Sequence, residues 1–210
     1  MTSFGETTLS GFLDELASGA ATPGGGCASA LAGALAAGLA AMVARNTASS
    51  AAFADRAASM DEIAAEADGL RRRLEELVDA DAAAFERVLA AFRLPKETPE
   101  QKADRSRAIQ DGYRAAVEPP ASVCRDALRV LELAALVAER GNPNAVSDAG
   151  VAALLAAGAL EGAALNVEIN LGSIRDEEFR SAHADAVREL RESASALRET
   201  TLARVRATFG

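Results

Sequence analysis

Residues 22–46 read TPGGGCASALAGALAAGLAAMVARN, a glycine-rich turn followed by an uncharged run, residues 27–44. Most of this run is Ala and Gly, and Ala has the highest helix propensity of all residues. The stretch therefore predicts a helix that extends to about residue 46. A helix that is apolar on every side lies in a protein core or crosses a membrane. We favour a buried core helix, because Ala and Gly are only weakly apolar and Arg45 ends the run.

The composition of the whole chain predicts an all-α protein. Half of the 210 residues are hydrophobic and 52 are alanine, whereas only 4% are aromatic. The β-branched and aromatic residues that favour strands are scarce. We expect one helical domain over residues 1–210, with two buried Ala/Gly-rich helices. Because an alanine core gains little from each buried side chain, we also expect a homodimer formed through helix 27–46 or helix 149–171.

Turn and capping residues predict about seven helices. Thr98-Pro99-Glu100-Gln101 has the pattern of a capping box with Pro at the first helical position. We expect that helix to end at Pro119-Pro120, since proline breaks the backbone hydrogen bonds of a helix. Ser147 and Asp148 are expected to cap the second nearly uncharged helix. The expected helices cover residues 6–18, 27–46, 53–92, 98–118, 121–140, 149–171 and 176–208.

Charge and residue counts exclude several classes of function. The net charge of −9 opposes nucleic-acid binding, which needs a basic face. One histidine, His183, and two cysteines, Cys27 and Cys124, are too few for the usual zinc sites. Two cysteines and the lack of an apolar export segment fit a reducing compartment, so we expect a cytoplasmic protein without membrane contact.

Asp81 interrupts an apolar helical stripe. Steps of three and four residues place it on one face between Leu77 and Phe85. A carboxylate on a buried face is costly unless it is paired, and its pKa is often raised. Asp81 is therefore a candidate catalytic group. The alternatives are that the stripe meets solvent there, or that Asp81 caps a helix or pairs with an arginine.

Three further features allow both a functional and a structural interpretation. His183 lies on the packed face of the last helix, where a structural histidine is the commoner case. Lys96, one of only two lysines, follows Leu94-Pro95 and is either aimed by this rigid turn or solvated. Gly24, Gly25 and Gly26 could let a ligand approach the backbone at a helix N-terminus, or could allow close helix crossing.

An ordered set of motifs resembles a known family. The set comprises Thr22-Pro23-Gly24-Gly25-Gly26 before a small-residue helix, Asp81 within DADAAAF, Arg93-Leu94-Pro95-Lys96, Gly141-Asn142-Pro143-Asn144, Ser147-Asp148-Ala149-Gly150 and Asn166 to Leu171. Together they resemble the formimidoyltetrahydrofolate cyclodeaminase and methenyltetrahydrofolate cyclohydrolase family over nearly the whole chain. Cys27 departs from the pattern, because relatives usually place Ser, Gly or Ala there, and we assign it no role.

The resemblance implies a dimeric helical enzyme that binds a tetrahydrofolate derivative near the glycine turn. Asp81 would accept a proton and stabilise a cationic amidine, Lys96 would be a proton partner or a carboxylate anchor, and Asp148 joins them as a catalytic candidate. The expected substrate-binding residues are Thr22, Pro23, Gly24, Gly25, Gly26, Asn144, Ser147 and Asn166. Arg45 or Arg71 to Arg73 would meet the glutamate tail of folate.

Two reactions fit this assignment, and neither needs a metal or a cofactor beyond the tetrahydrofolate substrate. A cyclohydrolase opens 5,10-methenyltetrahydrofolate to 10-formyltetrahydrofolate, and a cyclodeaminase forms the methenyl compound and releases ammonia. We favour the cyclohydrolase, because the chain resembles the free-standing bacterial enzymes. A third possibility is a helical scaffold or folate-binding module without catalysis.

Overall fold

The computed structural model describes residues 4–209, and in this range it contains α-helices and short 3-10 helices but no strand. The expectation of an all-α fold is confirmed. The six α-helices of the described range are α1 (Leu9–Ala17), α2 (Gly25–Ala48), α3 (Ala57–Phe92), α4 (Pro99–Arg140), α5 (Val146–Leu171) and α6 (Glu177–Ala207).

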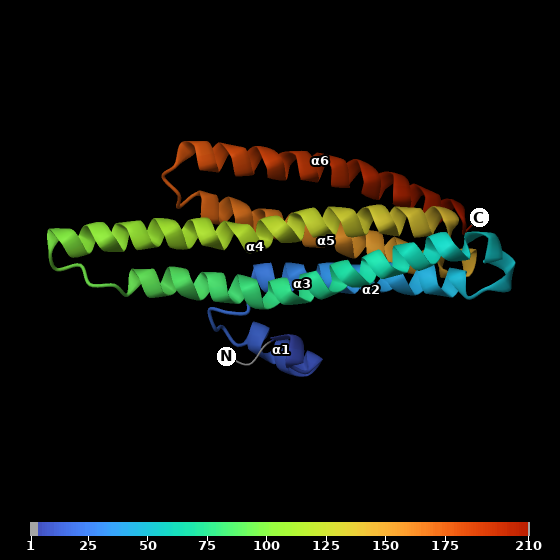
Figure 1. Ribbon diagram of the computed structural model, residues 1–210, viewed down its shortest axis with the longest axis horizontal. Coiled ribbons are helices and arrows are strands. Elements are labelled where there is room, and N and C mark those ends of the chain that lie inside the picture. Colours follow the sequence, from blue (N-terminus) through green and yellow to red (C-terminus); the bar gives the residue numbers. More distant parts are fainter. Residues whose placement is uncertain (1–3, 210) are drawn as a thin grey trace.

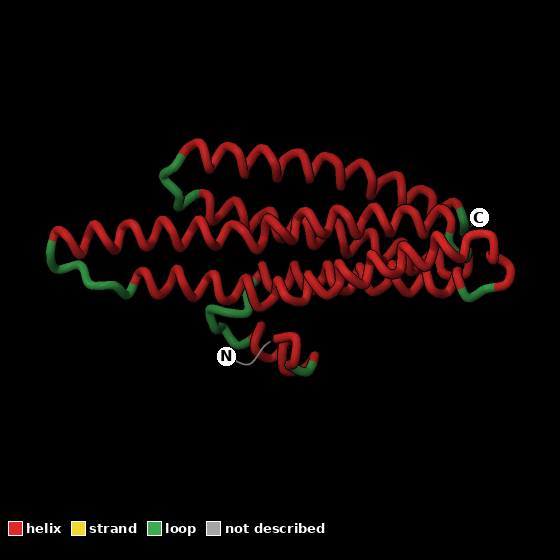
Figure 2. Tube along the Cα trace, in the orientation of Figure 1, coloured by secondary structure: helices red, strands yellow, loops and turns green. Residues whose placement is uncertain are grey.

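Helices α2 to α5 form an elongated bundle in which successive helices run in opposite directions (Figure 1). Helices α3 and α4 make a long hairpin, and α2 and α5 pack against it and against each other. Helix α6 packs along α4 and α5, whereas the short α1 lies beside the bundle near the N-terminus. Loops are confined to the ends of the helices (Figure 2). The glycine turn before α2 and the turn before α5 therefore lie at opposite ends of α2, and the α3–α4 hairpin extends beyond the glycine turn.

The expected break at Pro119-Pro120 is wrong, because α4 continues through both prolines. Pro120 has no N–H to donate to the carbonyl of Ala116, four residues earlier. The side-chain amide of Asn170, on α5, donates to that carbonyl at 2.9 Å instead. Both prolines are buried against the bundle. A tertiary hydrogen bond thus replaces the lost helical one, and two expected helices are one.

Several expected helix starts also differ from the structure. Helix α5 begins at Val146, so Ser147 and Asp148 lie inside its first turn and do not cap it; Asn142 caps the preceding 3-10 turn instead. Helix α3 begins at Ala57, after a 3-10 segment that contains Phe53. Helix α1 begins at Leu9 behind the cap residue Thr8. The expected capping box of α4 and the first turn of α6 are present, the latter capped by Asp176.

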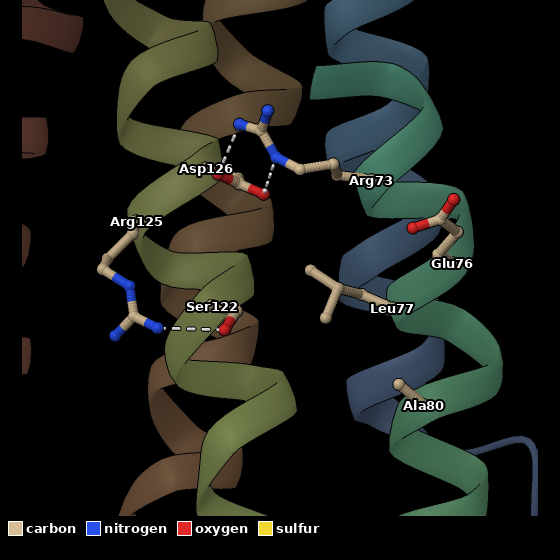
Figure 3. A pocket seen from close by; sticks show the side chains of 7 residues that line it. All are labelled: Arg73, Glu76, Leu77, Ala80, Ser122, Arg125 and Asp126. Carbon is tan, nitrogen blue, oxygen red and sulfur yellow. Dashed lines mark hydrogen bonds and ion pairs between the residues drawn. The ribbon is translucent and has the colours of Figure 1, made fainter. Parts of the chain in front are cut away.

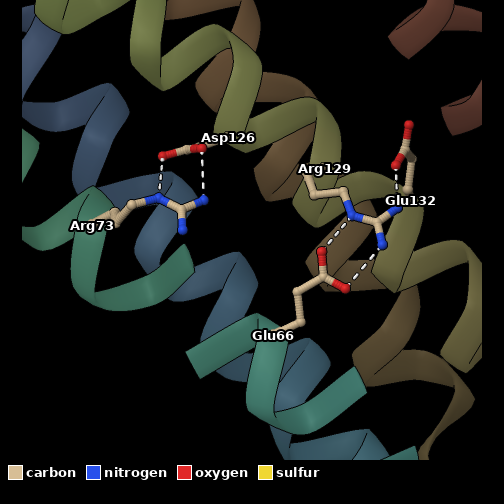
Figure 4. Close-up of polar contacts among 5 residues, drawn as sticks. All are labelled: Glu66, Arg73, Asp126, Arg129 and Glu132. Carbon is tan, nitrogen blue, oxygen red and sulfur yellow. Dashed lines mark hydrogen bonds and ion pairs between the residues drawn. The ribbon is translucent and has the colours of Figure 1, made fainter. Parts of the chain in front are cut away.

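Ion pairs join the α3–α4 hairpin along its outer side (Figure 4). Arg129 on α4 donates to both carboxylate oxygens of Glu66 on α3, at 2.6 and 2.9 Å, and also to Glu132. Arg73 on α3 pairs with Asp126 on α4 at 3.0 Å. These side chains are partly exposed, so the pairs fix the helix register more than they add stability.

Helices α2 and α5 each have one buried side and one exposed apolar side. On α2 the exposed side carries Leu35 and Met42, and on α5 it carries Val151, Leu154, Leu165 and Ile169. By length and composition, α2 and the segment Pro143–Leu171 could each cross a membrane, but 61% and 56% of their most apolar windows are buried inside the fold. We call the exposed side of these two helices the α2/α5 face.

Candidate active site

The N-terminus of α2 lacks a cap from its own segment. Gly24 occupies the N-cap position, and a glycine has no side chain that could accept from the first backbone N–H groups. The Thr22–Pro23 peptide bond before it is cis, and Gly25, the first residue of α2, is exposed. The start of α2 therefore presents backbone donors and the positive end of a helix dipole to whatever lies beside it.

Asp81, on α3, supplies the missing cap from another helix. Its Oδ2 lies 3.4 Å from the thiol sulfur of Cys27, and the backbone N–H of Cys27 also donates to this carboxylate. A Cβ atom on Gly26 would come closer than 3.0 Å to both carboxylate oxygens. The side chain is half-buried. Asp81 thus packs directly on the first turn of α2, as the helix-cap alternative requires, and still reaches the surface.

Two opposing influences act on the protonation of Asp81. Burial is the larger, and it raises the pKa of the carboxyl group above its ordinary value. The thiol and the backbone N–H of Cys27 act in the other direction, because they donate to the charged form. The balance leaves a carboxylate that takes up a proton more readily than an exposed aspartate does. A general base benefits from such a pKa.

Asn166, on α5, stands on the other side of the α2 N-terminus. Its Nδ2 donates to the carbonyl of Gly162 at 2.8 Å and would lie 3.4 Å from a Cβ on Gly25. Ser29 donates to the carbonyl of Gly25 at 2.7 Å, and a side chain on Gly162 would collide with the Ser29 hydroxyl. Asp81 therefore packs on the buried Gly26, and Asn166 lies beside the exposed Gly25. We call this group of residues the glycine-turn site.

A cavity of about 260 Å³ opens beside this site, between α1, α2 and α3. Val78, whose carbonyl lies 3.4 Å from the Cys27 sulfur, forms part of its wall one turn of α3 before Asp81. Phe12, the buried residue of α1, closes another side. The residues that line the cavity are Gly5, Thr7, Leu9, Phe12, Leu31, Glu75 and Val78.

The other residues expected in the site lie elsewhere in the protomer. Lys96 is exposed in the α3–α4 loop, beyond the end of α3, which continues for about 17 Å past Asp81. Asn144, Ser147 and Asp148 lie at the α5 N-terminus, where Asn142 bonds to Asn46 and Thr47 at the far end of α2. Since α2 is about 36 Å long, one protomer does not bring this turn to the glycine-turn site.

His183 and the arginines considered for the glutamate tail have identifiable partners. The His183 ring stacks on Phe179, with centroids 4.0 Å apart, and its Nε2 lies 3.7 Å from Glu118 on α4. His183 is thus part of the α4–α6 contact. Of the arginines, Arg45 pairs with Asp68, Arg71 pairs with Glu75 and Arg73 pairs with Asp126, whereas Arg72 is exposed.

A second hollow, of about 390 Å³, lies between α3 and α4 on the side of the Arg73–Asp126 pair (Figure 3). Arg125 donates to Ser122 at 2.9 Å, and Glu76 stands on the opposite wall. Its lining contains two arginines and two carboxylates, so its formal charge is balanced. Within residues 4–209, no group of three or more His, Cys, Asp and Glu side chains could hold a metal ion.

Sequence reasoning missed the contact of Cys27 with Asp81. The helical period places both residues on inward-facing sides of their helices, and this signal was available. Tertiary packing decides which two helices meet and at which register, and Cys27 and Asp81 lie 54 residues apart in the sequence. The exposed side of α2 was likewise missed, because an almost uniform run of Ala, Gly and Leu carries no period that marks it.

Comparisons with known proteins agree on one family. The family model described as formiminotransferase-cyclodeaminase matches residues 8–189. A methenyltetrahydrofolate cyclohydrolase from Methylorubrum extorquens is 39% identical over 195 residues, which are 93% of this chain and 94% of that protein. The formimidoyltransferase-cyclodeaminase of Mus musculus is 33% identical over 83% of this chain, but the match spans only 32% of that longer protein.

A solved structure has the same fold. The crystal structure of a formiminotetrahydrofolate cyclodeaminase from Thermotoga maritima superposes with a TM-score of 0.88 and covers 98% of both chains, at 27% identity. The similarity therefore extends over the whole bundle and includes α6, which lies largely beyond the last residue matched by the family model.

Proposed function

This chain belongs to the formiminotransferase-cyclodeaminase family, and we propose that it hydrolyses 5,10-methenyltetrahydrofolate to 10-formyltetrahydrofolate. It is a folate-dependent one-carbon enzyme with cyclohydrolase or cyclodeaminase activity. The cyclohydrolase assignment is supported by the Methylorubrum relative, to which the chain is 39% identical over 195 residues that cover nearly all of both proteins. The observation that carries the mechanism is a half-buried carboxylate, Asp81, beside an exposed helix N-terminus.

The reaction needs a base next to a cation. The methenyl carbon bridges N5 and N10 as an amidinium ion, and water attacks this carbon. Asp81 accepts a proton from the water as the new C–O bond forms, and its negative charge helps to bind the cationic substrate beside it. The tetrahedral intermediate then loses its C–N5 bond, N5 takes up a proton, and the formyl group stays on N10. One water is consumed and one proton is released.

We assign binding to the residues that surround Asp81. Backbone N–H groups at Gly25 and Gly26 and the amide of Asn166 would hydrogen-bond the polar edge of the pterin, with Thr22, Pro23 and Gly24 shaping the approach. The cavity between α1, α2 and α3 would take the adjoining part of the substrate, since Leu31 and Phe12 give it apolar walls.

We propose that the chain forms a homodimer through the α2/α5 face. Six large apolar side chains are exposed on these two helices, which pack against each other, and exposed apolar side chains that gather in this way are typical of an interface. The roles proposed for Lys96, Asn144, Ser147 and Asp148 require this second protomer, because one protomer keeps them apart from Asp81. A site shared across the interface would combine the glycine turn of one protomer with the α3–α4 loop or the α5 N-terminus of the other.

The remaining assignments follow the composition. We propose a cytoplasmic enzyme with no cofactor beyond its folate substrate, and with no nucleic-acid or membrane partner. The net charge of −9 and two buried free thiols support this view.

The cyclodeaminase reaction is the second candidate, favoured by the likeness to the Thermotoga structure. In that reaction N10 closes onto a formimino carbon and ammonia leaves, so Asp81 would again face a cationic amidine. One experiment separates the two activities. The purified protein is given methenyltetrahydrofolate in one cuvette and formimidoyltetrahydrofolate in another, and the methenyl chromophore is followed. We expect decay in the first without formation in the second; formation with ammonia release would reverse the assignment.

A further inference from the structure

Cys27 holds a position that no part of the proposed mechanism has used. It is the third residue of α2, and its side chain is completely buried. Its sulfur lies 3.4 Å from the carbonyl oxygen of Val78 and 3.4 Å from Oδ2 of Asp81, both on α3. One S–H group therefore faces two acceptors, one of which belongs to the proposed base.

The carboxylate is the stronger of these two acceptors. The carbonyl of Val78 lies inside the continuous helix α3, where the backbone N–H of Ala82 already donates to it. The carboxylate of Asp81 carries negative charge, and hydrogen bonds to charged acceptors are about twice as strong as neutral ones. The thiol proton consequently points to Asp81.

The thiol remains protonated under the conditions in which an enzyme works. Burial raises the pKa of Cys27 to about 12, and the negative charge of Asp81 also raises it. A thiol that keeps its proton is a hydrogen-bond donor and neither a nucleophile nor a metal ligand. Cys124, the other cysteine, is also buried, but its thiol faces the carbonyl of Leu160 at 3.6 Å, away from Asp81.

We propose that Cys27 is a positioning residue for Asp81, whose carboxylate its thiol holds against the first turn of α2. The thiol and the N–H of Cys27 engage the carboxylate on its buried side, and the backbone of Gly26 limits its movement. The remaining lone pairs then face the exposed side of the glycine-turn site. This inference rests on the proposed role of Asp81 as the base.

The proposal predicts the acid strength of Asp81 in two variants. In Cys27→Ala the carboxylate loses a donor while its burial persists, so we expect Asp81 to become an about three- to tenfold weaker acid. The acid limb of the pH profile of kcat/KM moves to higher pH by the corresponding amount, about 0.5 to 1 pH unit. In Cys27→Ser a hydroxyl donor is restored, and the profile returns to that of the parent or below it. Cys124→Ala is the matched control and leaves the profile unchanged.

A spectroscopic measurement tests the hydrogen bond without any substitution at Cys27. In Cys124→Ala the S–H stretching band of the infrared spectrum comes from Cys27 alone, because the chain has two cysteines. We expect this band at the lower frequency of a thiol bonded to a carboxylate. It should rise in frequency when Asp81→Asn is added, and also when the pH is lowered far enough to protonate Asp81.

The outcomes separate this inference from the proposed function. The positioning role is overturned if the S–H stretching frequency changes neither with Asp81→Asn nor with acid. It is also overturned if the pH profile of kcat/KM of Cys27→Ala equals that of the parent. Either result leaves Asp81 as the base. Parental turnover in Asp81→Asn overturns the catalytic role of Asp81, and the infrared experiment still decides whether Cys27 holds its carboxylate.

Discussion

Gly26 and Asp81 compete for one volume at the start of α2. A Cβ atom on Gly26 would come closer than 3.0 Å to both carboxylate oxygens, so the absence of a side chain on one residue permits the position of the other. The glycine turn therefore acts through contact between two helices, in addition to any contact with a ligand. Its three glycines also differ in their tolerance of substitution.

The first prediction compares two of these glycines. Gly26→Ala should displace the Asp81 carboxylate from the first turn of α2 and lower turnover by at least about tenfold, because a misplaced base loses much of its effect. Gly25→Ala meets only Asn166, at an ordinary contact distance of 3.4 Å, and should keep the fold while weakening folate binding. Stopped-flow turnover and equilibrium binding measure both effects. Equal turnover in the two variants would contradict this view.

The second prediction concerns the α2/α5 face. Leu35→Glu places a charge at the middle of the exposed side of α2, and a charge buried in an interface without a partner is costly. We expect sedimentation to show a dimer for the parent and a monomer for this variant. Leu13→Glu, on α1, is the matched control, since Leu13 is 51% exposed and Leu35 is 55% exposed. A parent that sediments at 21.6 kDa at micromolar concentration would rule out the proposed dimer.

The sequence predicts the helical class and the position of Asp81 on a partly buried helix face, and the reasons for these successes differ from those for its failures. Alanine content and the capping box at Thr98 act locally, so they identify helices reliably. The break in the apolar helical period at Asp81 is likewise visible in the local sequence. Continuity through Pro119-Pro120 is not, because it depends on Asn170 from another helix. The pairing of Cys27 with Asp81 and the distance of Ser147 from both are likewise properties of packing.

The third prediction uses the pH dependence of stability. Hydrogen bonds from Arg129 hold the pKa of Glu66 below its ordinary value in the folded protein. A carboxyl group with a lowered folded-state pKa adds stability above its unfolded-state pKa, and this stability disappears as the pH falls through the folded-state value. Glu66→Gln should therefore lower the free energy of unfolding by about 1 kcal/mol or less at pH 7, since the pair is partly exposed. The difference from the parent in urea unfolding should vanish in strong acid; a constant difference would point to packing instead.

The fourth prediction asks whether Lys96 acts across the dimer. Lys96→Arg keeps the positive charge but changes its shape and removes a usable proton donor, so we expect lower turnover. If Lys96 serves the site of the partner protomer, mixing Lys96→Arg with Asp81→Asn recovers about a quarter of parental activity, because half of the dimers are mixed and each has one intact site. Absence of recovery, with mixed dimers verified by differential tags, would exclude the shared site. Parental turnover in Lys96→Arg would exclude a role for Lys96 as a proton donor.

The last prediction concerns Asp81 itself. Asp81→Asn keeps the size of the side chain and an oxygen that can accept from the N–H of Cys27, so α2 should remain capped and the variant should fold. It removes the base and the negative charge, and turnover should fall by about two to four powers of ten, the range typical for loss of general acid–base catalysis. Folate binding, measured with a product analogue, should change far less.

The stability of the same variant distinguishes a catalytic from a structural carboxylate. Burial raises the folded-state pKa of Asp81, so its ionisation costs stability as the pH rises from the unfolded-state pKa to the folded-state pKa. Asn carries no such cost, and the variant should gain stability relative to the parent between acid and neutral pH. If Asp81 is a catalytic group whose ionisation lowers the stability of the fold, Asp81→Asn should be stable and inactive. If the variant unfolds more easily at neutral pH and keeps parental turnover, Asp81 is a helix cap and the base must be sought elsewhere.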